Sequence, residues 1–239
     1  VLQSIADDNG IQIKLNKDEV EDANYIKIDI LSNKRLSQLW DISHTPILEY
    51  PNGDQRVYDF FAKGDNLGLT YGESRGMRKI FVEMKPTCIH DIAAALALIR
   101  PAAAKNGQKF NFLKTYHLPG NVNRNDFVIY DDDAIEYISR MLKISLSEAD
   151  IYRKAFAKNK WKLKGVFKTK LRLSQPKMTD EDIQFICDKL ESLQSYSFCK
   201  SHAYSYAYLL FALGYQKMTN PHGFWKATLK NCNTSYRKW

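Results

Sequence analysis

The sequence predicts a mainly α fold with a short β-containing segment at its N-terminus. In the later part of the chain, apolar residues recur at every third or fourth position, as in residues 92–99, 135–142 and 183–190, and this spacing is typical of one helix face. Residues 25–31 (YIKIDIL) alternate instead, which is the pattern of a strand with one buried face. The strand and the helices are considered below in chain order.

On the predicted strand, Ile26, Ile28 and Ile30 share the apolar face, and Lys27 and Asp29 share the other. Side chains two residues apart on one strand face stand about 7 Å from each other, so Lys27 and Asp29 are close enough to serve one ligand. The alternative is a solvent-facing pair on an edge strand.

Residues 44–61 are rich in turn-forming residues, among them Pro46, Pro51 and Asn52-Gly53, and this composition indicates a linker or a domain boundary. We place the boundary between residues 45 and 46, which gives predicted domains 1–45 and 46–239.

Helix signals follow this boundary. Pro101 should stop the helix that contains residues 92–99, leaving Arg100 at its C-terminal end. Residues 131–142 begin with three aspartates, which the helix macrodipole would stabilise without a metal ion. Ser145 and Glu148 have the spacing of a capping box, and Thr179 is a candidate N-cap for the next helix.

Charge and cysteine content limit the class of protein. The 239 residues carry a formal charge of +8, and no apolar run reaches the ~20 residues of a membrane span. The four cysteines form no CxxC pair, which argues against a zinc module and fits reduced thiols in the cytoplasm. The chain does not open with a signal peptide, and it lacks an initiator Met, so we expect a fragment or a processed product.

Residues 151–179 contain no acidic side chain, and their cations exceed the whole net charge. Aromatic residues interleave this stretch, a pattern that favours contact with a phosphate backbone; the alternative is a solvated face. The ten cations of this basic stretch are Arg153, Lys154, Lys158, Lys160, Lys162, Lys164, Lys168, Lys170, Arg172 and Lys177.

In SYSFCKSHAYSYAYLL (residues 195–210), Lys200 and His202 stand at a turn that enters a helix. Both side chains can donate to phosphate oxygens, although His202 could equally be a structural histidine. We expect Tyr204, Tyr208 and Phe211 to form the packing stripe of this helix rather than a stacking platform.

Several stretches together resemble the C-family replicative DNA polymerases, the α subunit of bacterial DNA polymerase III and its phage relatives. FAKGDNLGLTYGESRGMRKIFVEMKP, followed by DIAAALALIRP, is similar to the segment that opens the fingers domain of that family. YIKIDIL resembles the last palm strand, which carries the third catalytic aspartate. The residues in register are Glu73, Ser74, Gly76, Met77, Arg78, Lys85, Pro86, Asp91, Arg100 and Pro101.

Three later stretches follow in the family's order: IYDDDAIEYI, LSEADIYRKAFAKNK and SYSFCKSHAYSYAYLLFALGYQKMTNPHGFWKATL. The resemblance covers roughly residues 15–235. Departures include RPAAA in place of RPGP and TYGES in place of FQLES, so the sequence is similar to a divergent, phage-like member. The family's other two catalytic aspartates lie upstream of the matching palm strand, and nothing before Asp29 resembles their segment.

The resemblance implies the end of the palm (residues 1–45) and most of a helical fingers domain (residues 46–239) of a DNA-directed DNA polymerase that uses a two-metal mechanism. Asp29 would be the catalytic carboxylate and a Mg²⁺ ligand. Nucleotide binding is assigned to Lys27, Arg100, Tyr130, Arg153, Lys154, Lys200 and His202. DNA binding is assigned to Arg78, Lys158, Lys160, Lys162 and Lys164.

The implied partners are primer–template DNA, deoxynucleoside triphosphates and a further polymerase segment that carries the remaining catalytic aspartates. The isolated chain should not catalyse, because one aspartate cannot build a two-metal site. No membrane partner is expected, and the implied location is the bacterial nucleoid or the cytoplasm of a phage-infected cell. Glu73 and Arg78 could form a structural ion pair or part of the active-site wall.

Two alternatives remain. The chain could be a non-catalytic nucleic-acid-binding module, for instance a decayed polymerase fragment that works through the basic stretch. It could also be a basic helical scaffold for RNA or for an acidic protein.

Overall fold

The protein was analysed as a computed structural model, which describes residues 4–7, 10–26, 33–99, 112–114, 116, 129–191 and 198–231. The chain divides into two compact units, residues 1–34 and 35–239. The described residues are mainly helical, as predicted.

The first unit contains an antiparallel hairpin and one short helix. Strands β1 (Ser4–Asp7) and β2 (Gly10–Ile13) pair with Ser4 opposite Ile13. Helix α1 (Lys17–Asp22) follows. Asn16 and Glu19 form a reciprocal cap at its start, since each backbone N–H donates to the other side chain, at 2.7 and 2.9 Å.

The hairpin does not coincide with the predicted strand at residues 25–31. Tyr25 and Ile26 have no regular secondary structure, and Ile26 is 87% exposed, so it does not belong to a buried strand face. Residues 27–31, and with them Lys27 and Asp29, lie outside the described residues.

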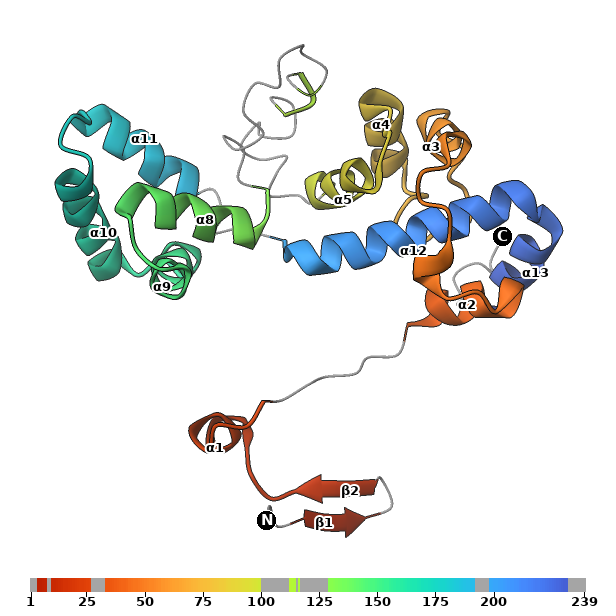
Figure 1. The fold of residues 1–239 in the computed structure, drawn as a ribbon, viewed down its shortest axis with the longest axis horizontal. Helices are drawn as coiled ribbons and strands as arrows, with labels where there is room; N and C mark the ends of the chain where they lie inside the picture. Colours follow the sequence, from red (N-terminus) through yellow and green to blue (C-terminus); the bar gives the residue numbers. More distant parts are fainter. Residues whose placement is uncertain are drawn as a thin grey trace. The chain divides into compact units, whose positions relative to one another are not determined.

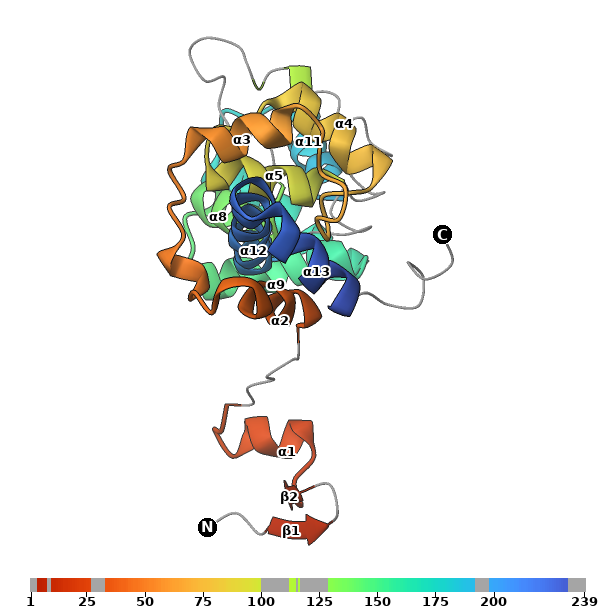
Figure 2. The same ribbon diagram turned by 90° about the vertical axis from the view of Figure 1, so that its right-hand side faces the viewer.

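The second unit is built around α12 (Lys200–Thr219). Figure 2 looks nearly along this helix, with α3, α4 and α5 on one side and α2 and α13 on the other. These elements form the α12 cluster: α2 (Lys34–Ser43), the 3-10 helix η1 (Ile47–Glu49), α3 (Gln55–Ala62), α4 (Arg75–Met84), α5 (Ile89–Leu98) and α13 (Pro221–Asn231).

Small residues on α12 allow its neighbours to approach closely. A Cβ at Gly214 would stand 2.8 Å from the ring of Phe61 on α3, so a larger residue here would require the Phe61 ring or one of the helices to shift. Phe211 is buried, and Tyr204 and Tyr208 are partly buried against the same core. These three residues therefore pack in the core, as expected from the sequence.

Residues 44–61, which we expected to be a linker or boundary, instead contain η1 and α3. Val57, Tyr58 and Phe61 of α3 are fully buried. The Pro and Gly residues form turns between short packed helices rather than a spacer between domains.

Four further helices form the α8–α11 cluster, a group with its own apolar core (Figure 1). These are α8 (Asp131–Leu142), α9 (Leu146–Ala157), α10 (Trp161–Ser174) and α11 (Asp180–Glu191). The predicted caps are present: the Ser145 side chain accepts from the Glu148 N–H, and the Thr179 hydroxyl accepts from the Asp182 N–H. The predicted stripe of α11 is buried as well, at Ile183, Ile186, Cys187 and Leu190.

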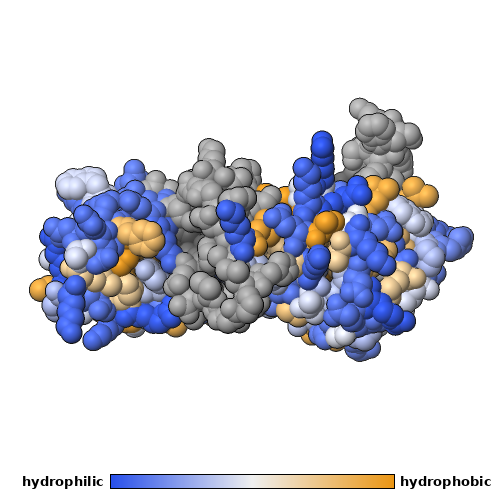
Figure 3. Space-filling view, turned by 90° about the horizontal axis from the view of Figure 1, so that it is seen from above, coloured by the Kyte–Doolittle hydropathy of each residue, from blue (hydrophilic) through white to orange (hydrophobic). Residues whose placement is uncertain are grey.

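Within the described residues, no helix is both long and apolar enough to cross a membrane. The face shown in Figure 3 is largely hydrophilic, with hydrophobic side chains scattered in small patches.

Cys88, Cys187 and Cys199 are free thiols.

Candidate nucleotide and nucleic-acid interface

The α8–α11 cluster meets the α12 cluster at the N-terminus of α8. Tyr130 forms a parallel β-bridge with Phe198, and the Asp131 N–H donates to the Phe198 carbonyl at 3.1 Å. Asp133 closes the start of the helix, because its carboxylate accepts from the N–H groups of Tyr130 and Ile129 at 3.0 and 3.1 Å. The three aspartates, which we expected the helix dipole to stabilise, therefore stand where the two helix clusters meet.

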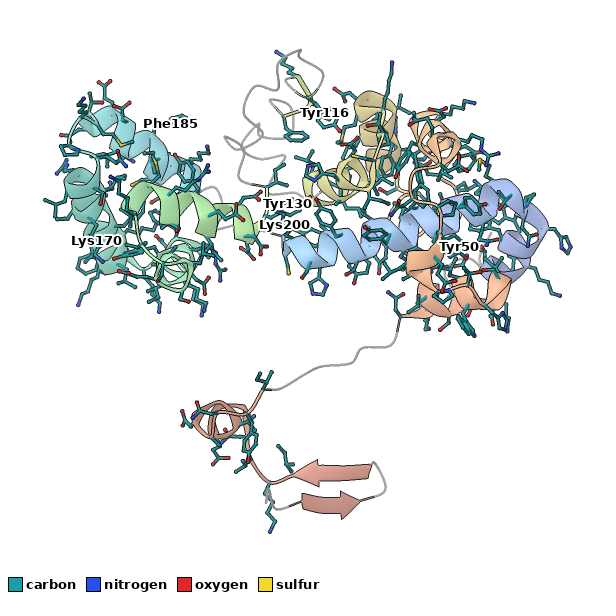
Figure 4. The ribbon with its side chains drawn as sticks, viewed as in Figure 1. Tyr50, Tyr116, Tyr130, Lys170, Phe185 and Lys200 are labelled. Atoms are coloured by element: carbon teal, nitrogen blue, oxygen red, sulfur yellow. The ribbon has the colours of Figure 1, made fainter. Side chains whose placement is uncertain are left out.

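Lys200, the first residue of α12, is held at this junction. Its backbone N–H donates to the Asp132 carboxylate at 3.1 Å, and its ammonium lies 3.9 Å from an Asp133 oxygen. The same ammonium lies 6.0 Å from the centre of the Tyr130 ring. Figure 4 shows Tyr130 and Lys200 side by side between α8 and α12.

Arg153 reaches the same aspartates from α9. Its Nε and Nη2 atoms lie 2.8 and 2.7 Å from Asp150, and its Nη1 lies 3.4 Å from Asp131. The side chain is 19% exposed, so the guanidinium is fixed in direction before any ligand arrives. Lys154 is more exposed, and its ammonium lies 2.7 Å from the other oxygen of Asp150.

Thus Tyr130, Arg153 and Lys200, predicted separately from three stretches, lie around the N-terminus of α8. We call this group, with Asp131, Asp132 and Asp133, the α8 junction.

Burial sets the protonation properties of the α8 junction. It raises the pKa of Asp131, although the nearby Arg153 guanidinium opposes the shift. It also raises the pKa of Asp133, against the hydrogen bonds from Tyr130 and Ile129. Burial raises the pKa of Tyr130 well above its usual value, and this hydroxyl has no hydrogen-bond partner among the described residues. Tyr130 is therefore neutral at physiological pH, and its buried hydroxyl is a donor without a partner among the described residues.

Two other predicted residues lie elsewhere. His202 is exposed and stacks on Tyr206, with ring centres 6.1 Å apart; it is two residues from Lys200, so it projects from a different side of α12. Arg78 on α4 donates from Nε to the Gly64 carbonyl at 2.7 Å. Glu73 accepts from the Gly68 N–H at 3.1 Å, so Arg78 and Glu73 both brace the loop of residues 63–74. Arg100 lies outside the described residues.

The structure divides the basic stretch into paired and unpaired cations. Besides Arg153 and Lys154, three cations pair with acids from neighbouring helices: Lys164 with Glu191, Lys170 with Glu148 and Arg172 with Asp180. Lys168 donates to Gln184. Within the described part of the chain, no ion pair involves Lys158, Lys160, Lys162 or Lys177.

Lys164 is the prediction that needs correction in this stretch. It is 9% exposed, and its ammonium donates to Asn159 at 2.7 Å and to Glu191 at 2.8 Å. The ammonium also lies 5.5 Å from the Phe156 ring centre. Because the side chain is buried and two of its three N–H donors bind Asn159 and Glu191, Lys164 is a packing residue and not a surface contact for phosphate.

The role of the acidic residues at the α8 junction was missed in the sequence. We attributed Asp131, Asp132 and Asp133 to the helix dipole alone, whereas they also orient Arg153 and Lys200. The acidic run itself was the available signal, but its partners are 20 to 70 residues away in the chain, and only the tertiary structure brings them together.

The described residues do not form a complete metal site. No group of three His, Cys, Asp or Glu side chains in the described ranges could hold a metal ion. The aspartates of the α8 junction are turned toward Arg153 and Lys200, so they do not supply a free set of carboxylates for Mg²⁺.

Comparison with known proteins agrees with the order of motifs in the sequence. A family model described as the bacterial DNA polymerase III alpha subunit finger domain matches residues 1–172. The DNA polymerase III subunit alpha of Aquifex aeolicus (strain VF5) is 28% identical over 237 residues, covering 88% of this chain and 20% of that protein. The protein of the same name from Staphylococcus aureus (strain Mu50 / ATCC 700699) is 26% identical over 252 residues, covering 97% and 24%.

The chain therefore spans about a fifth to a quarter of the length of these curated relatives. The family match takes in the hairpin, α1 to α5, α8, α9 and most of α10, and it includes Tyr130 and Arg153 of the α8 junction. Since this match covers well over half of its residues, the chain belongs to the family of the bacterial DNA polymerase III alpha subunit finger domain.

Proposed function

We propose that this chain is the nucleotide-binding part of a DNA-directed DNA polymerase that extends a primer 3′ end with deoxynucleotides. The observation that carries the proposal is the α8 junction, where Arg153 and Lys200, 47 residues apart in the chain, each lie beside an aspartate of the first turn of α8. A triphosphate needs several cations at one place, and forked guanidinium groups suit phosphate oxygens.

The existing contacts would prepare this group for a ligand. Asp131 and Asp150 fix the guanidinium of Arg153, so little side-chain entropy remains to be lost on binding. The Lys154 ammonium pairs with Asp150 alone, and its side chain is largely exposed, so it can turn toward a phosphate. Tyr130 adds a neutral hydroxyl donor. We include Lys27, Arg100 and His202 in the proposed nucleotide site because of the resemblance in sequence.

Catalysis requires a set of carboxylates that hold the metal ions, and the described residues contain no such group. We propose that Asp29 contributes one ligand to a Mg²⁺ site and that a further polymerase segment provides the others. Arg78, Lys158, Lys160 and Lys162 are proposed to contact primer–template DNA. Lys164 is left out because its ammonium is already bound.

The nucleotide site is tested by measuring the affinity of the chain for a deoxynucleoside triphosphate. Arg153→Ala or Lys200→Ala should weaken binding roughly 10- to 100-fold, which is the effect expected from losing a charge-assisted hydrogen bond. Lys177→Ala is the matched control, since Lys177 is an exposed cation of the same stretch that has no place in the α8 junction. Equal weakening by all three variants would contradict the assignment.

The polymerase activity is tested by combining the chain with a segment that carries the two missing aspartates. We expect Mg²⁺-dependent primer extension that Asp29→Ala abolishes. Extension that survives Asp29→Ala would remove Asp29 from catalysis. Binding of DNA without nucleotide binding or extension would favour the alternative of a non-catalytic nucleic-acid-binding module.

A further inference from the structure

Three of the four unpaired cations of the basic stretch lie within three residues of one exposed aromatic residue, Trp161. Lys158 ends α9, Lys160 precedes α10, and Lys162 is the second residue of α10. Trp161 stands among them as the first residue of α10 and is 74% exposed. The other cations of α9 and α10 contact acids or Gln184, so the unpaired positive charge of these two helices lies at the turn between them.

An indole in this position has an accessible face and a cation beside it. The Lys162 ammonium lies 5.5 Å from the centre of the Trp161 ring. The structure gives Trp161 no packing role, because its side chain is mostly exposed and it belongs to neither apolar core. An exposed tryptophan gains little stability for the fold, but it offers a large flat surface on which a base can stack.

Gly165 leaves the surface of α10 uncovered one helical turn after Trp161. It lies one helical turn after Trp161, and helix side chains lean toward the N-terminus, so a residue at position 165 would cover the turn that carries Trp161. A Cβ added at Gly165 meets no atom within 4 Å, so no close packing requires glycine here. Glycine inside a helix is unfavourable relative to alanine, and leaving the turn that carries Trp161 uncovered would give glycine a role at this position.

We propose that Trp161, Lys158, Lys160 and Lys162 form a binding site for single-stranded DNA, which we call the Trp161 platform. The indole stacks on one unpaired base, and the three ammonium groups contact the phosphates on either side of it. The proposal deepens the proposed function, on which it rests, because a polymerase template is single-stranded ahead of the primer. Duplex DNA does not fit this role, since its base faces are already stacked on one another.

Charge favours nucleic acid over a protein partner at the Trp161 platform. A protein interface core is depleted in lysine, whereas lysines flank Trp161 on both sides. The aromatic residue between cations is the arrangement that single-strand binding surfaces use.

The test is the affinity of the whole chain for a labelled oligo-dT strand and for a hairpin duplex, measured by fluorescence anisotropy. Trp161→Ala should weaken single-strand binding roughly 5- to 150-fold, the effect of losing one stacked base, and change duplex binding less than about twofold. Trp161→Phe should restore much of the loss. Trp40→Ala is the matched control, because Trp40 is an exposed tryptophan on α2, outside the Trp161 platform.

Salt dependence separates stacking from charge. Replacing Lys158, Lys160 and Lys162 together by Gln should reduce the slope of log affinity against log salt by about 2 for a single strand, whereas Trp161→Ala should leave the slope unchanged. Lys177→Gln is the control for one lost surface cation. At position 165, Gly165→Leu should weaken single-strand binding by covering the indole, and Gly165→Ala should weaken it less.

The outcomes distinguish this proposal from the proposed function. Equal losses on single strand and duplex with Trp161→Ala, or no loss at all, would overturn the Trp161 platform. Nucleotide binding through Arg153 and Lys200 would stand in either case, since it has its own assay. Failure of the Arg153 and Lys200 variants to affect nucleotide binding, together with single-strand binding through Trp161, would overturn the polymerase role and leave the platform intact.

Discussion

Single residues of this chain show that tertiary contacts decide which cationic side chains are available to bind a phosphate. Arg153, Lys162 and Lys164 belong to one basic stretch and look alike in sequence. In the structure, Arg153 is oriented by two aspartates, and Lys164 is buried in an ion pair with Glu191. Lys162 lies beside Trp161. The burial of each ammonium or guanidinium, and the acid next to it, decides which cation can meet a phosphate.

Lys164→Gln should destabilise the fold without affecting DNA binding. The substitution removes the contacts to Asn159 and Glu191 and should lower the free energy of unfolding by about 1–2 kcal/mol, because Glu191 is partly exposed and can be rehydrated. Urea denaturation measures this change. Lys162→Gln is the paired variant and should show the reverse pattern; loss of DNA affinity in folded Lys164→Gln would restore Lys164 to the DNA-binding set.

Tyr130→Phe should have opposite effects on stability and on nucleotide binding. The Tyr130 side chain is 2% exposed, and its hydroxyl has no partner among the described residues, so removing it should raise the free energy of unfolding by up to about 1 kcal/mol. If the hydroxyl donates to the nucleotide, triphosphate affinity should fall in the same variant. Thermal unfolding and nucleotide titration measure the two effects, and unchanged affinity would remove Tyr130 from the nucleotide site.

At the scale of elements, the start of α5 depends on one buried carboxylate. Asp91 accepts from the N–H and the hydroxyl of Thr87 at 2.8 and 3.0 Å. These contacts place Asp91 at the N-terminal end of a helix that packs along α12, where negative charge is favourable. The sequence identified Asp91 as a family position, and the structure gives it a role in holding the helix start.

Asp91→Asn should reduce the pH dependence of stability. Burial opposes ionisation of Asp91, but the interactions with Tyr116 and Thr87 outweigh it and hold its pKa below the ordinary value. A lowered pKa in the folded state means that the stabilisation is complete above about pH 4 and is lost as pH falls further. The free energy of unfolding, measured by urea between pH 7 and 3, should fall less steeply in Asp91→Asn, and the variant should be about 1–3 kcal/mol less stable at pH 7.

A steeper acid loss in Asp91→Asn than in the wild type would contradict this account. Asp131 and Asp133 act in the opposite direction, since their raised pKa values make them a cost at neutral pH that protonation relieves. The comparison must therefore use the difference between wild type and variant, which cancels their contribution.

At the scale of the whole molecule, the contacts of α2 decide where the larger unit begins in the chain. Leu39 of α2 is buried, and the Gln38 amide donates to Thr228 on α13 at 2.8 Å. Asp41 contacts Lys230 at 3.0 Å. These contacts assign α2 to the larger unit, whereas our predicted domain boundary at residues 45 and 46 would cut it off.

Two truncations test this division. A chain that begins at residue 34 should unfold at nearly the same temperature as the full chain. In a chain that begins at residue 46, the free energy of unfolding should fall by about 3 kcal/mol. The truncation exposes the core surface that Leu39 covers and removes the hydrogen bond between Gln38 and Thr228. Differential scanning calorimetry measures both, and equal stability of the two truncations would show that α2 contributes little to the larger unit.

The sequence by itself determined the helical character of the chain, several helix caps, the buried stripe of α11 and the family. These features are local: apolar spacing sets a helix face, and a Ser or Thr three residues before an acid sets a helix start. Only the tertiary structure decided which cations are paired, that residues 47–62 contain two packed helices, and that Arg153 and Lys200 share one junction. The reason is physical, because charge pairing and burial depend on neighbours that are distant in the chain, and local spacing contains no record of them.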